Sequence, residues 1–277
     1  MIADEGGEMT VGGGLGRLGE NVWYNGSGTS KKEDIMEAIQ TISLTKKYKD
    51  VVAVDHLDLT IAQGELFSLL GVNGAGKTTT IKMLSCLTRP TSGQAHVCGH
   101  SIIGEEWAVK ARIGVSPQET AVAPNLTVLE NLELMCGIYG LSDAARRKKI
   151  GMLCQQFTLG EILQKKAGKL SGGWQRRLSL AMALVGDPAV LFLDEPTLGL
   201  DVIARSALWD VIRDLKGRVT MVLTTHYMEE AEALSDRIGI MKDGRLLAVG
   251  TPAQIMAQTG TDRMEQAFIA VVKEGQQ

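Results

Sequence analysis

Hydrophobic and polar positions change their pattern at about Ile35, and from there they predict strands that alternate with helices. Leu57, Leu59 and Ile61 alternate with polar residues, as in a half-buried strand. Further apolar stretches of strand length cover residues 65–71, 189–193 and 219–225. Helices are predicted to start after the capping residues Thr127, Ser142 and Ser171, and a further helix is predicted over about 202–216.

Strands that are separated by helices indicate a mostly parallel sheet covered on both faces. The helices between about residues 120 and 170 then form an insertion. Farther along, Asp243-Gly244 joins two apolar runs and predicts a hairpin turn. Thr251-Pro252 is typical of a helix cap followed by the first helical residue, so a short helix is expected there.

The composition is that of a globular chain, because 44% of the 277 residues are hydrophobic and 22% are charged. A formal net charge of −3 argues against indiscriminate binding of nucleic acid, which needs a basic field. The 4 cysteines include no C-x-x-C pair, which argues against a disulfide framework and a zinc finger. No apolar run reaches the roughly 18 to 20 residues of a membrane-spanning helix. The acidic start lacks the features of a secretory signal, so we expect a cytoplasmic protein.

Residues 1–36 form a glycine-rich segment that we expect to be a flexible tail. The spacing Gly14-x-Gly16-x-x-Gly19 satisfies a dinucleotide-binding pattern, but that pattern requires a strand before it and a helix after it. Glycine-rich sequence stands on both sides here. We therefore interpret the match as a result of composition and not as a site.

The most specific motif is a glycine-rich loop between a predicted strand and a predicted helix. It has the full pattern G-x-x-x-x-G-K-[ST], in which backbone N–H groups and a helix N-terminus surround phosphate oxygens. Lys77 adds a full positive charge, and Thr78 offers a hydroxyl group to Mg²⁺. The residues expected to bind the phosphates are Gly71, Asn73, Gly74, Ala75, Gly76, Lys77, Thr78 and Thr79. The motif predicts a nucleoside triphosphate site.

Two adjacent acids, Asp194 and Glu195, follow an apolar strand. Successive strand residues point to opposite sides, so the two carboxylates cannot serve the same role. We expect Asp194 to be a ligand of Mg²⁺ and Glu195 to be the base that acts on the attacking water.

A second anion site is predicted in the segment Leu170-Ser171-Gly172-Gly173-Trp174-Gln175-Arg176-Arg177. Ser171 caps a helix whose first residues are Gly172 and Gly173. A hydroxyl group, unobstructed N–H groups and the positive end of a helix dipole would then face one point.

These motifs, in this order, resemble the nucleotide-binding subunit of ATP-binding cassette (ABC) transporters over about residues 38–250. The resemblance implies roles for four more residues. Gln118 resembles the Q-loop glutamine, a ligand of Mg²⁺, and Asp201 resembles the D-loop aspartate. His226 resembles the switch histidine, and Tyr48 resembles the aromatic residue on which adenine stacks, just before the strand that leads to the phosphate loop. Taken alone, a single His or Tyr is more often structural.

The resemblance also implies the fold: an α/β P-loop NTPase (RecA-like) core with a mostly parallel sheet, an antiparallel β subdomain and a helical insertion at about residues 120–172. The ATPase domain would cover residues 37–250, and a short helical extension would cover residues 251–277. ATP and Mg²⁺ would be the ligands. The catalytic residues would be Lys77, Gln118, Glu195 and His226.

In this family the signature segment closes over the ATP that another cassette holds. Ser171, Gly172 and Gly173 would therefore contact the ATP of a second copy, or of a paralogous cassette, in a head-to-tail dimer with two nucleotides. The chain departs from the family at Trp174, where glutamine is usual. Two interpretations stay open for this residue, because it either approaches the nucleotide sugar or packs beside the interface.

Residues 126–132 and 139–141 resemble the ATPases of bacterial two-component exporters of the drug-resistance and sodium-efflux type, also called ABC-2 type. The ending at residues 264–268 resembles that group too, although it equally fits an ordinary amphipathic helix. We therefore expect an export subunit that works with a separate membrane permease, which would contact the insertion near Gln118. The subunit would lie on the inner face of the cell membrane, and no nucleic acid partner is expected.

The alternative function is a soluble ABC ATPase that acts on ribosomes or DNA. Such proteins usually carry two cassettes, long coiled coils or zinc-binding cysteine pairs, and this sequence shows none of these. A P-loop kinase that passes phosphate to a metabolite is a third interpretation. It leaves the segment Ser171-Gly172-Gly173 unexplained.

Overall fold

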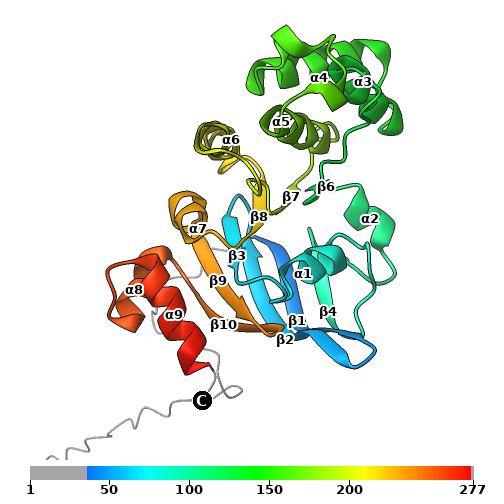
Figure 1. The fold of residues 1–277 in the computed structure, drawn as a ribbon. Coiled ribbons are helices and arrows are strands. Elements are labelled where there is room, and N and C mark those ends of the chain that lie inside the picture. The colour runs from blue at the N-terminus through cyan, green and yellow to red at the C-terminus, as the bar shows by residue number, and fades with distance from the viewer. Residues whose placement is uncertain (1–35, 276–277) are drawn as a thin grey trace, which may run out of the picture.

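The structure is a computed structural model that describes residues 36–275. It contains two sheets, and the larger one carries the candidate site (Figure 1). Its strands are β3 (Leu66–Leu70), β6 (Ile113–Ser116), β7 (Val190–Asp194), β8 (Thr220–Thr225), β9 (Arg237–Lys242) and β10 (Arg245–Gly250). They lie in the order β10-β9-β3-β8-β7-β6. All neighbours pair in parallel except β9 and β10, which form the hairpin predicted at Asp243-Gly244. The predicted mostly parallel sheet is confirmed.

The second sheet is antiparallel and forms the expected β subdomain. Its strands are β1 (Glu37–Tyr48), β2 (Val51–Ala62), β4 (Ser92–Val97) and β5 (His100–Ser101), in the order β2-β1-β4-β5. Leu57, Leu59 and Ile61 are buried in β2, as their alternation predicts. The hydrophobic pattern does not predict β1, because register shifts on both sides of Leu44 interrupt the alternation.

Alternate residues of the parallel strands enter two different hydrophobic cores. Phe192 and Val222 pack with the antiparallel sheet and with α1 (Lys77–Leu84). Leu191 and Leu223 pack with α5 (Gly172–Ala183) and α6 (Val202–Leu215). Figure 1 shows α5 and α6 on one side of the larger sheet, and α1 with the antiparallel sheet on the other. Both faces of the parallel sheet are therefore covered, as the sequence predicts.

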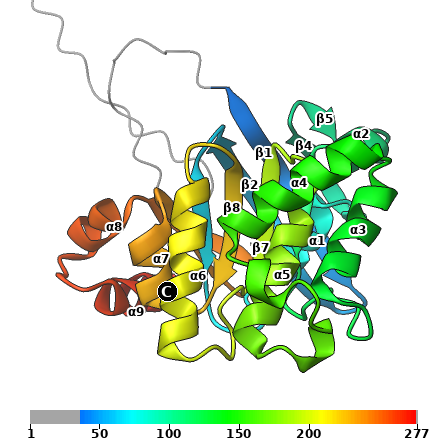
Figure 2. The same ribbon diagram turned by 90° about the horizontal axis from the view of Figure 1, so that it is seen from above.

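The helical insertion follows β6 and leads into α5 (Figure 2). It contains α3 (Val128–Ile138), α4 (Asp143–Gln156) and two short 3₁₀ turns, Gly160–Ile162 and Ala167–Lys169. Thr127 and Glu130 form the predicted capping box of α3, and the hydroxyl group of Ser142 accepts a hydrogen bond from the N–H of Ala145. A short helix, α2 (Glu106–Lys110), precedes β6.

The last part of the described chain packs on the β9–β10 side of the sheet as a third core. It contains α7 (Met228–Leu234), α8 (Pro252–Thr259) and α9 (Met264–Glu274). Thr251 and Pro252 start α8 as predicted.

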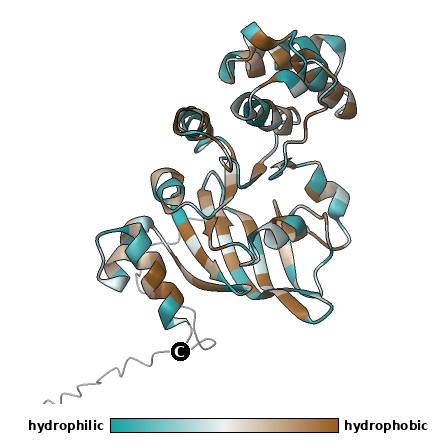
Figure 3. Cartoon of the chain, viewed as in Figure 1, coloured by the Kyte–Doolittle hydropathy of each residue, from teal (hydrophilic) through white to brown (hydrophobic). Residues whose placement is uncertain are grey.

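Figure 3 shows mostly hydrophobic residues along the strands and both hydrophobic and hydrophilic residues along the helices. Within residues 36–275 no helix is both long and apolar enough to span a membrane. The Gly14-x-Gly16-x-x-Gly19 match lies outside the described residues.

Candidate functional site

The glycine-rich loop connects the end of β3 to the start of α1, where the sequence places it. Gly76 has a φ of 105°, and a Cβ atom there would lie 2.4 Å from the carbonyl oxygen of Ala53. At Gly71 a Cβ atom would lie 2.3 Å from the carbonyl oxygen of Met241. Glycine is therefore required at both ends of the loop, because neighbouring backbone approaches too closely for any side chain.

Lys77, the first residue of α1, is buried and lies at the centre of the site. Its Nζ donates a hydrogen bond of 2.8 Å to the carbonyl oxygen of Gly71, and it lies 3.3 Å from Oε1 of Glu195. Glu195 and Gly71 are both buried as well. A buried ammonium group with these neighbours is a fixed positive charge at the helix N-terminus, where phosphate oxygens are favoured.

Asp194 ends β7 and contacts two hydroxyl groups. Oγ1 of Thr78 donates to its Oδ1 at 3.0 Å, and Oγ1 of Thr224 donates to the same oxygen at 2.5 Å. Sequence reasoning missed Thr224, a buried residue at the end of β8. The only signal for it was a pair of threonines at the end of an apolar strand. The hydroxyl oxygen of Thr78 and the carboxylate of Asp194 are the hard oxygen donors that Mg²⁺ prefers.

Glu195 bridges two other side chains. Oε1 faces Lys77, and Oε2 lies 2.9 Å from Nδ1 of His226, which follows β8. The backbone of Glu195 has a φ of 46°, and its N–H donates to the side chain of Thr224 at 3.0 Å. A positive φ in a residue other than glycine is strained and is typical of functional sites. The two carboxylates thus contact different groups, although Glu195 lies after β7 and does not follow the alternation of the strand. Their roles toward Mg²⁺ and the attacking water stay predictions.

Gln118 is exposed and lies after β6, and its backbone carbonyl oxygen is held by Arg176. The guanidinium group of Arg176 also donates to the carbonyl oxygen of Pro117. Arg176 is a buried residue of α5 that sequence reasoning did not single out, and burial lowers the pKa of its guanidinium group. No hydrogen bond of the Gln118 side chain is found within residues 36–275, so its predicted Mg²⁺ contact stays a prediction.

The signature helix α5 begins at Gly172, but its expected cap is wrong in one respect. Ser171 occupies the N-cap position, yet its hydroxyl group makes no capping hydrogen bond. Both Ser171 and Gly172 are exposed, and no hydrogen bond joins them to the glycine-rich loop in the described part of the chain. The hydroxyl group and the first N–H groups of the helix are therefore directed to the surface.

The residues after the signature glycines pack against α6. A Cβ atom at Gly173 would lie 3.0 Å from that of Ala204, so Gly173 has a packing role as well. Trp174 is partly buried against the core beneath α5 and α6, and the guanidinium carbon of Arg177 lies 4.9 Å from its ring centroid. These contacts lie within one chain, so both interpretations of Trp174 stay predictions.

Tyr48 and Asp201 lie at the ends of elements. Tyr48 is the last residue of β1 and is 45% exposed, with Nζ of Lys46 at 4.9 Å from its ring centroid. It precedes β2 and not the strand that leads to the glycine-rich loop, which corrects the sequence interpretation. Asp201 caps α6, and its Oδ1 accepts a hydrogen bond of 2.8 Å from the N–H of Ala204.

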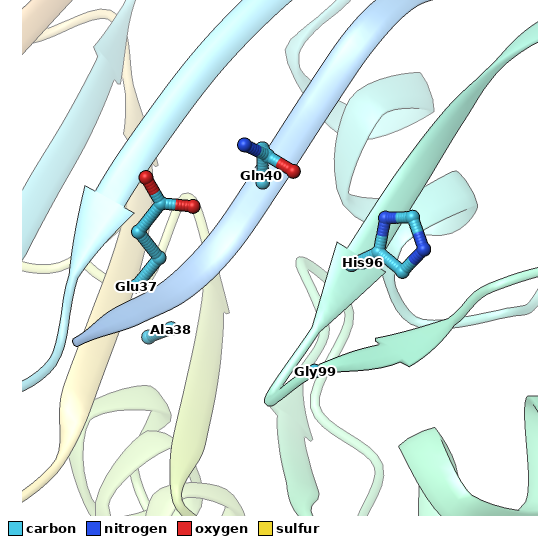
Figure 4. Close-up of a pocket in the computed structure, with 5 residues that line it drawn as sticks. All are labelled: Glu37, Ala38, Gln40, His96 and Gly99. Carbon is cyan, nitrogen blue, oxygen red and sulfur yellow. The ribbon is translucent and has the colours of Figure 1, made fainter.

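A hollow of about 230 Å³ borders the glycine-rich loop and is lined by Gly71, Val72, Asn73, His226, Met228 and Phe268. A second hollow of about 220 Å³ lies on the antiparallel sheet, lined by Glu37, Ala38, Gln40, His96 and Gly99 (Figure 4). None of the predicted site residues lines the second hollow. The first one places Phe268 of α9 beside the loop and the histidine.

The sequence profile of the family described as "ABC transporter" matches residues 54–198. The daunorubicin resistance ATP-binding protein DrrA3 of Streptomyces coeruleorubidus is 43% identical over 229 residues, which are 82% of this chain and 72% of that protein. The Nod factor export ATP-binding protein I of Burkholderia pseudomallei is 44% identical over 79% of this chain and 73% of its own length. The probable multidrug ABC transporter ATP-binding protein YbhF of Escherichia coli is 42% identical, and the chain spans 42% of that protein.

Solved structures agree with this result. One described as the ATP-binding subunit of an ABC transporter has a TM-score of 0.76 and 27% identity, and the match covers 85% of this chain and 99% of that one. A dimeric ATP-binding cassette in a post-hydrolysis state with ADP and Pi has a TM-score of 0.70 and 28% identity, with 77% and 98% covered. The chain belongs to the ABC transporter family, as an ATP-binding, ATP-hydrolysing subunit of the kind found in exporter systems.

Proposed function

We propose that this cassette hydrolyses MgATP with Glu195 as the general base and His226 as the residue that holds Glu195 and the reacting water in line. The observation that carries the proposal is the contact of one carboxylate with both Lys77 and His226, at 3.3 Å and 2.9 Å. A base so placed beside the phosphate-binding lysine is within reach of a water next to the γ-phosphate. Gln118 would complete the set from the exposed segment after β6.

The triphosphate would lie along the glycine-rich loop, from Gly71 to Thr79. The backbone N–H groups of this loop and the ammonium group of Lys77 would hold its oxygens. Thr78, Asp194 and Gln118 would hold Mg²⁺, which supplies neutralisation of the phosphate charge. Tyr48 would stack on adenine, because its ring is exposed at the end of β1.

We further propose that two cassettes associate head to tail around two MgATP, as a homodimer or with a paralogous cassette. Support comes from Ser171 and Gly172, which are both exposed, and from the hydroxyl group of Ser171, which makes no capping hydrogen bond within residues 36–275. Such groups at a helix N-terminus favour an anion. The γ-phosphate held by the second cassette would be this anion, and Asp201 would lie at the same seam. The related solved cassette is itself dimeric, which supports this arrangement.

The cassette would drive a separate membrane permease, and export is the direction we propose. The support is that its relatives include drug-resistance and Nod factor export ATP-binding proteins. The subunit would then be cytoplasmic and would bind the inner face of the membrane through the permease.

The test of this function is Glu195→Gln in the full chain. We expect ATP turnover to fall by about 10²–10⁴-fold, the effect of losing a general base, while MgATP still binds. The matched control is Glu229→Gln, which removes an exposed carboxylate of α7 and should hydrolyse at the parental rate. Turnover of Glu195→Gln at the parental rate would show that another group is the base.

A further inference from the structure

Tyr227, the residue after the histidine, packs its ring against the imidazole. The two ring centroids lie 4.1 Å apart, and the ring planes are inclined by 39°. The N–H of Tyr227 donates to the side chain of Thr225 at 3.0 Å, which fixes its backbone at the end of β8. The ring of Tyr227 therefore limits the positions that the imidazole of His226 can adopt.

The same ring also contacts α6. The guanidinium carbon of Arg205 lies 4.7 Å from the centroid of the Tyr227 ring. Nε of Arg205 is buried and has no hydrogen-bond partner within residues 36–275. The Tyr227 ring is therefore a close neighbour of this partly buried guanidinium group, and a cation–π contact there is favourable.

Glu230 anchors the same place from α7. Its carboxylate is fully buried, and Oε1 accepts a hydrogen bond of 3.0 Å from the indole of Trp209 in α6. Arg205 contributes an attractive charge to this carboxylate. Arg205 and Trp209 are one helical turn apart in α6. They contact Tyr227 and Glu230, which lie one and four residues after the histidine.

We propose that Tyr227 is a positioning residue for His226 and that Arg205 connects it to α6, the helix that Asp201 caps. This inference rests on the proposed function, since it takes His226 as the partner of Glu195. The contacts form one continuous series from α6 through Arg205, Tyr227 and His226 to Glu195. A shift of α6 at its first turn would then change the position of the imidazole against the catalytic carboxylate.

The experiment compares Tyr227→Leu and Tyr227→Phe in the full chain, each in the parental and in the His226→Ala background. Release of labelled phosphate is followed for hours, so that slow variants are measured. We expect Tyr227→Leu to lower kcat about tenfold or more with a KM for ATP within about threefold, because misplacing a catalytic group affects the chemical step. Tyr227→Phe, which keeps the ring, should stay near the parental rate.

The His226→Ala background separates positioning from a general structural effect. If Tyr227 acts through His226, Tyr227→Leu should cause less than about a twofold further loss there, because the two changes remove one function. An equal fractional loss in both backgrounds would overturn the proposal. So would a parental rate for Tyr227→Leu, or a loss in Tyr227→Phe as large as that in Tyr227→Leu.

Arg205→Gln tests the connection to α6. If circular dichroism shows that Tyr227→Leu does not fold, Arg205→Gln takes its place in the comparison. Arg205→Gln should lower kcat several-fold in the parental background and leave kcat unchanged in the His226→Ala background. Loss in both backgrounds, or in neither, would contradict the role of Arg205. A parental rate for His226→Ala itself would instead show that the proposed function misassigns the histidine, and the inference on Tyr227 would fail with it.

Discussion

Glu195 is constrained both by its backbone and by its side-chain contacts. It combines a φ of 46°, a buried side chain and contacts with Lys77 and His226. A buried carboxylate between a lysine and a histidine is costly to desolvate unless both partners stay in place. The strained backbone and the paired charges thus act together to hold one carboxylate orientation.

A residue-scale prediction concerns Tyr48, which is exposed enough for a base to stack on its ring. Stacking contributes roughly 0.5–1.5 kcal/mol beyond the buried area. Tyr48→Ala should therefore weaken ATP binding several-fold, whereas Tyr48→Phe should bind as the parent does. Calorimetric titration of the full chain with MgATP measures both. Equal losses in the two variants would mean that the hydroxyl group matters and that adenine lies elsewhere.

The sequence predicts those site residues whose chemistry is tied to a motif. Asp194 and Glu195 are predicted to contact different groups, and they do. The alternation of strand residues is not the reason, because β7 ends at Asp194 and Glu195 has a φ of 46°. Thr224 and Arg176 are not predicted, because each acts by a contact across the fold with a residue far away in the chain. The sequence also does not predict that Ser171 lacks a capping hydrogen bond. A serine before a helix predicts the N-cap position, but it does not show whether the hydroxyl group bonds to that helix.

Elements are predicted well where their hydrophobic pattern is regular and their ends are marked. The starts of α3, α4, α5 and α8 and the β9–β10 hairpin follow from capping and turn residues. Strands β1 and β4 do not follow from local sequence signals, because their pairing with neighbouring strands determines where they form. The strand β6 has only four residues, too few for a periodic signal.

The packing of α6 against α7 leads to a prediction on stability. Burial raises the pKa of Glu230 above its ordinary value of 4.5, although nearby hydroxyl groups, the Trp209 indole and Arg205 oppose this. The folded state therefore holds its proton more tightly than the unfolded state does. Between about pH 4.5 and the raised pKa, the contribution of Glu230 to the free energy of unfolding falls as the pH rises.

Glu230→Gln keeps the shape and an acceptor for the indole but carries no ionisable group. The difference in the free energy of unfolding, that of Glu230→Gln minus that of the parent, should therefore increase from pH 5 to pH 8. Urea unfolding at both pH values measures this difference. Glu229→Gln, on the exposed side of α7, is the control for loss of a charge. A difference that falls with pH would mean that Glu230 is stabilised as the anion.

At the scale of the whole molecule, the site lies where all three hydrophobic cores meet the larger sheet. Lys77 starts the helix that belongs to the core with the antiparallel sheet, and α5 belongs to the core on the opposite face. Phe268 brings the third core to the hollow beside the glycine-rich loop. The arrangement of the cores follows from the alternation of the strands, but the position of α9 could not be predicted, because it depends on which surface an amphipathic helix covers.

The exposed N-terminus of α5 predicts how the whole molecule associates. If Ser171 and Gly172 contact the ATP of a second cassette, slow hydrolysis should trap the pair, so Glu195→Gln should elute as a dimer in gel filtration with MgATP and as a monomer with ADP. Lys77→Ala should stay monomeric with either nucleotide, because it loses the phosphate contact that joins the two halves. Ser171→Arg in the Glu195→Gln background separates the two surfaces: it should bind MgATP yet remain monomeric, since its bulk and charge stand only at the seam. If the dimer persists in Ser171→Arg, the contact between cassettes lies on another surface. If Glu195→Gln binds MgATP but stays monomeric, each cassette completes its site without a second copy.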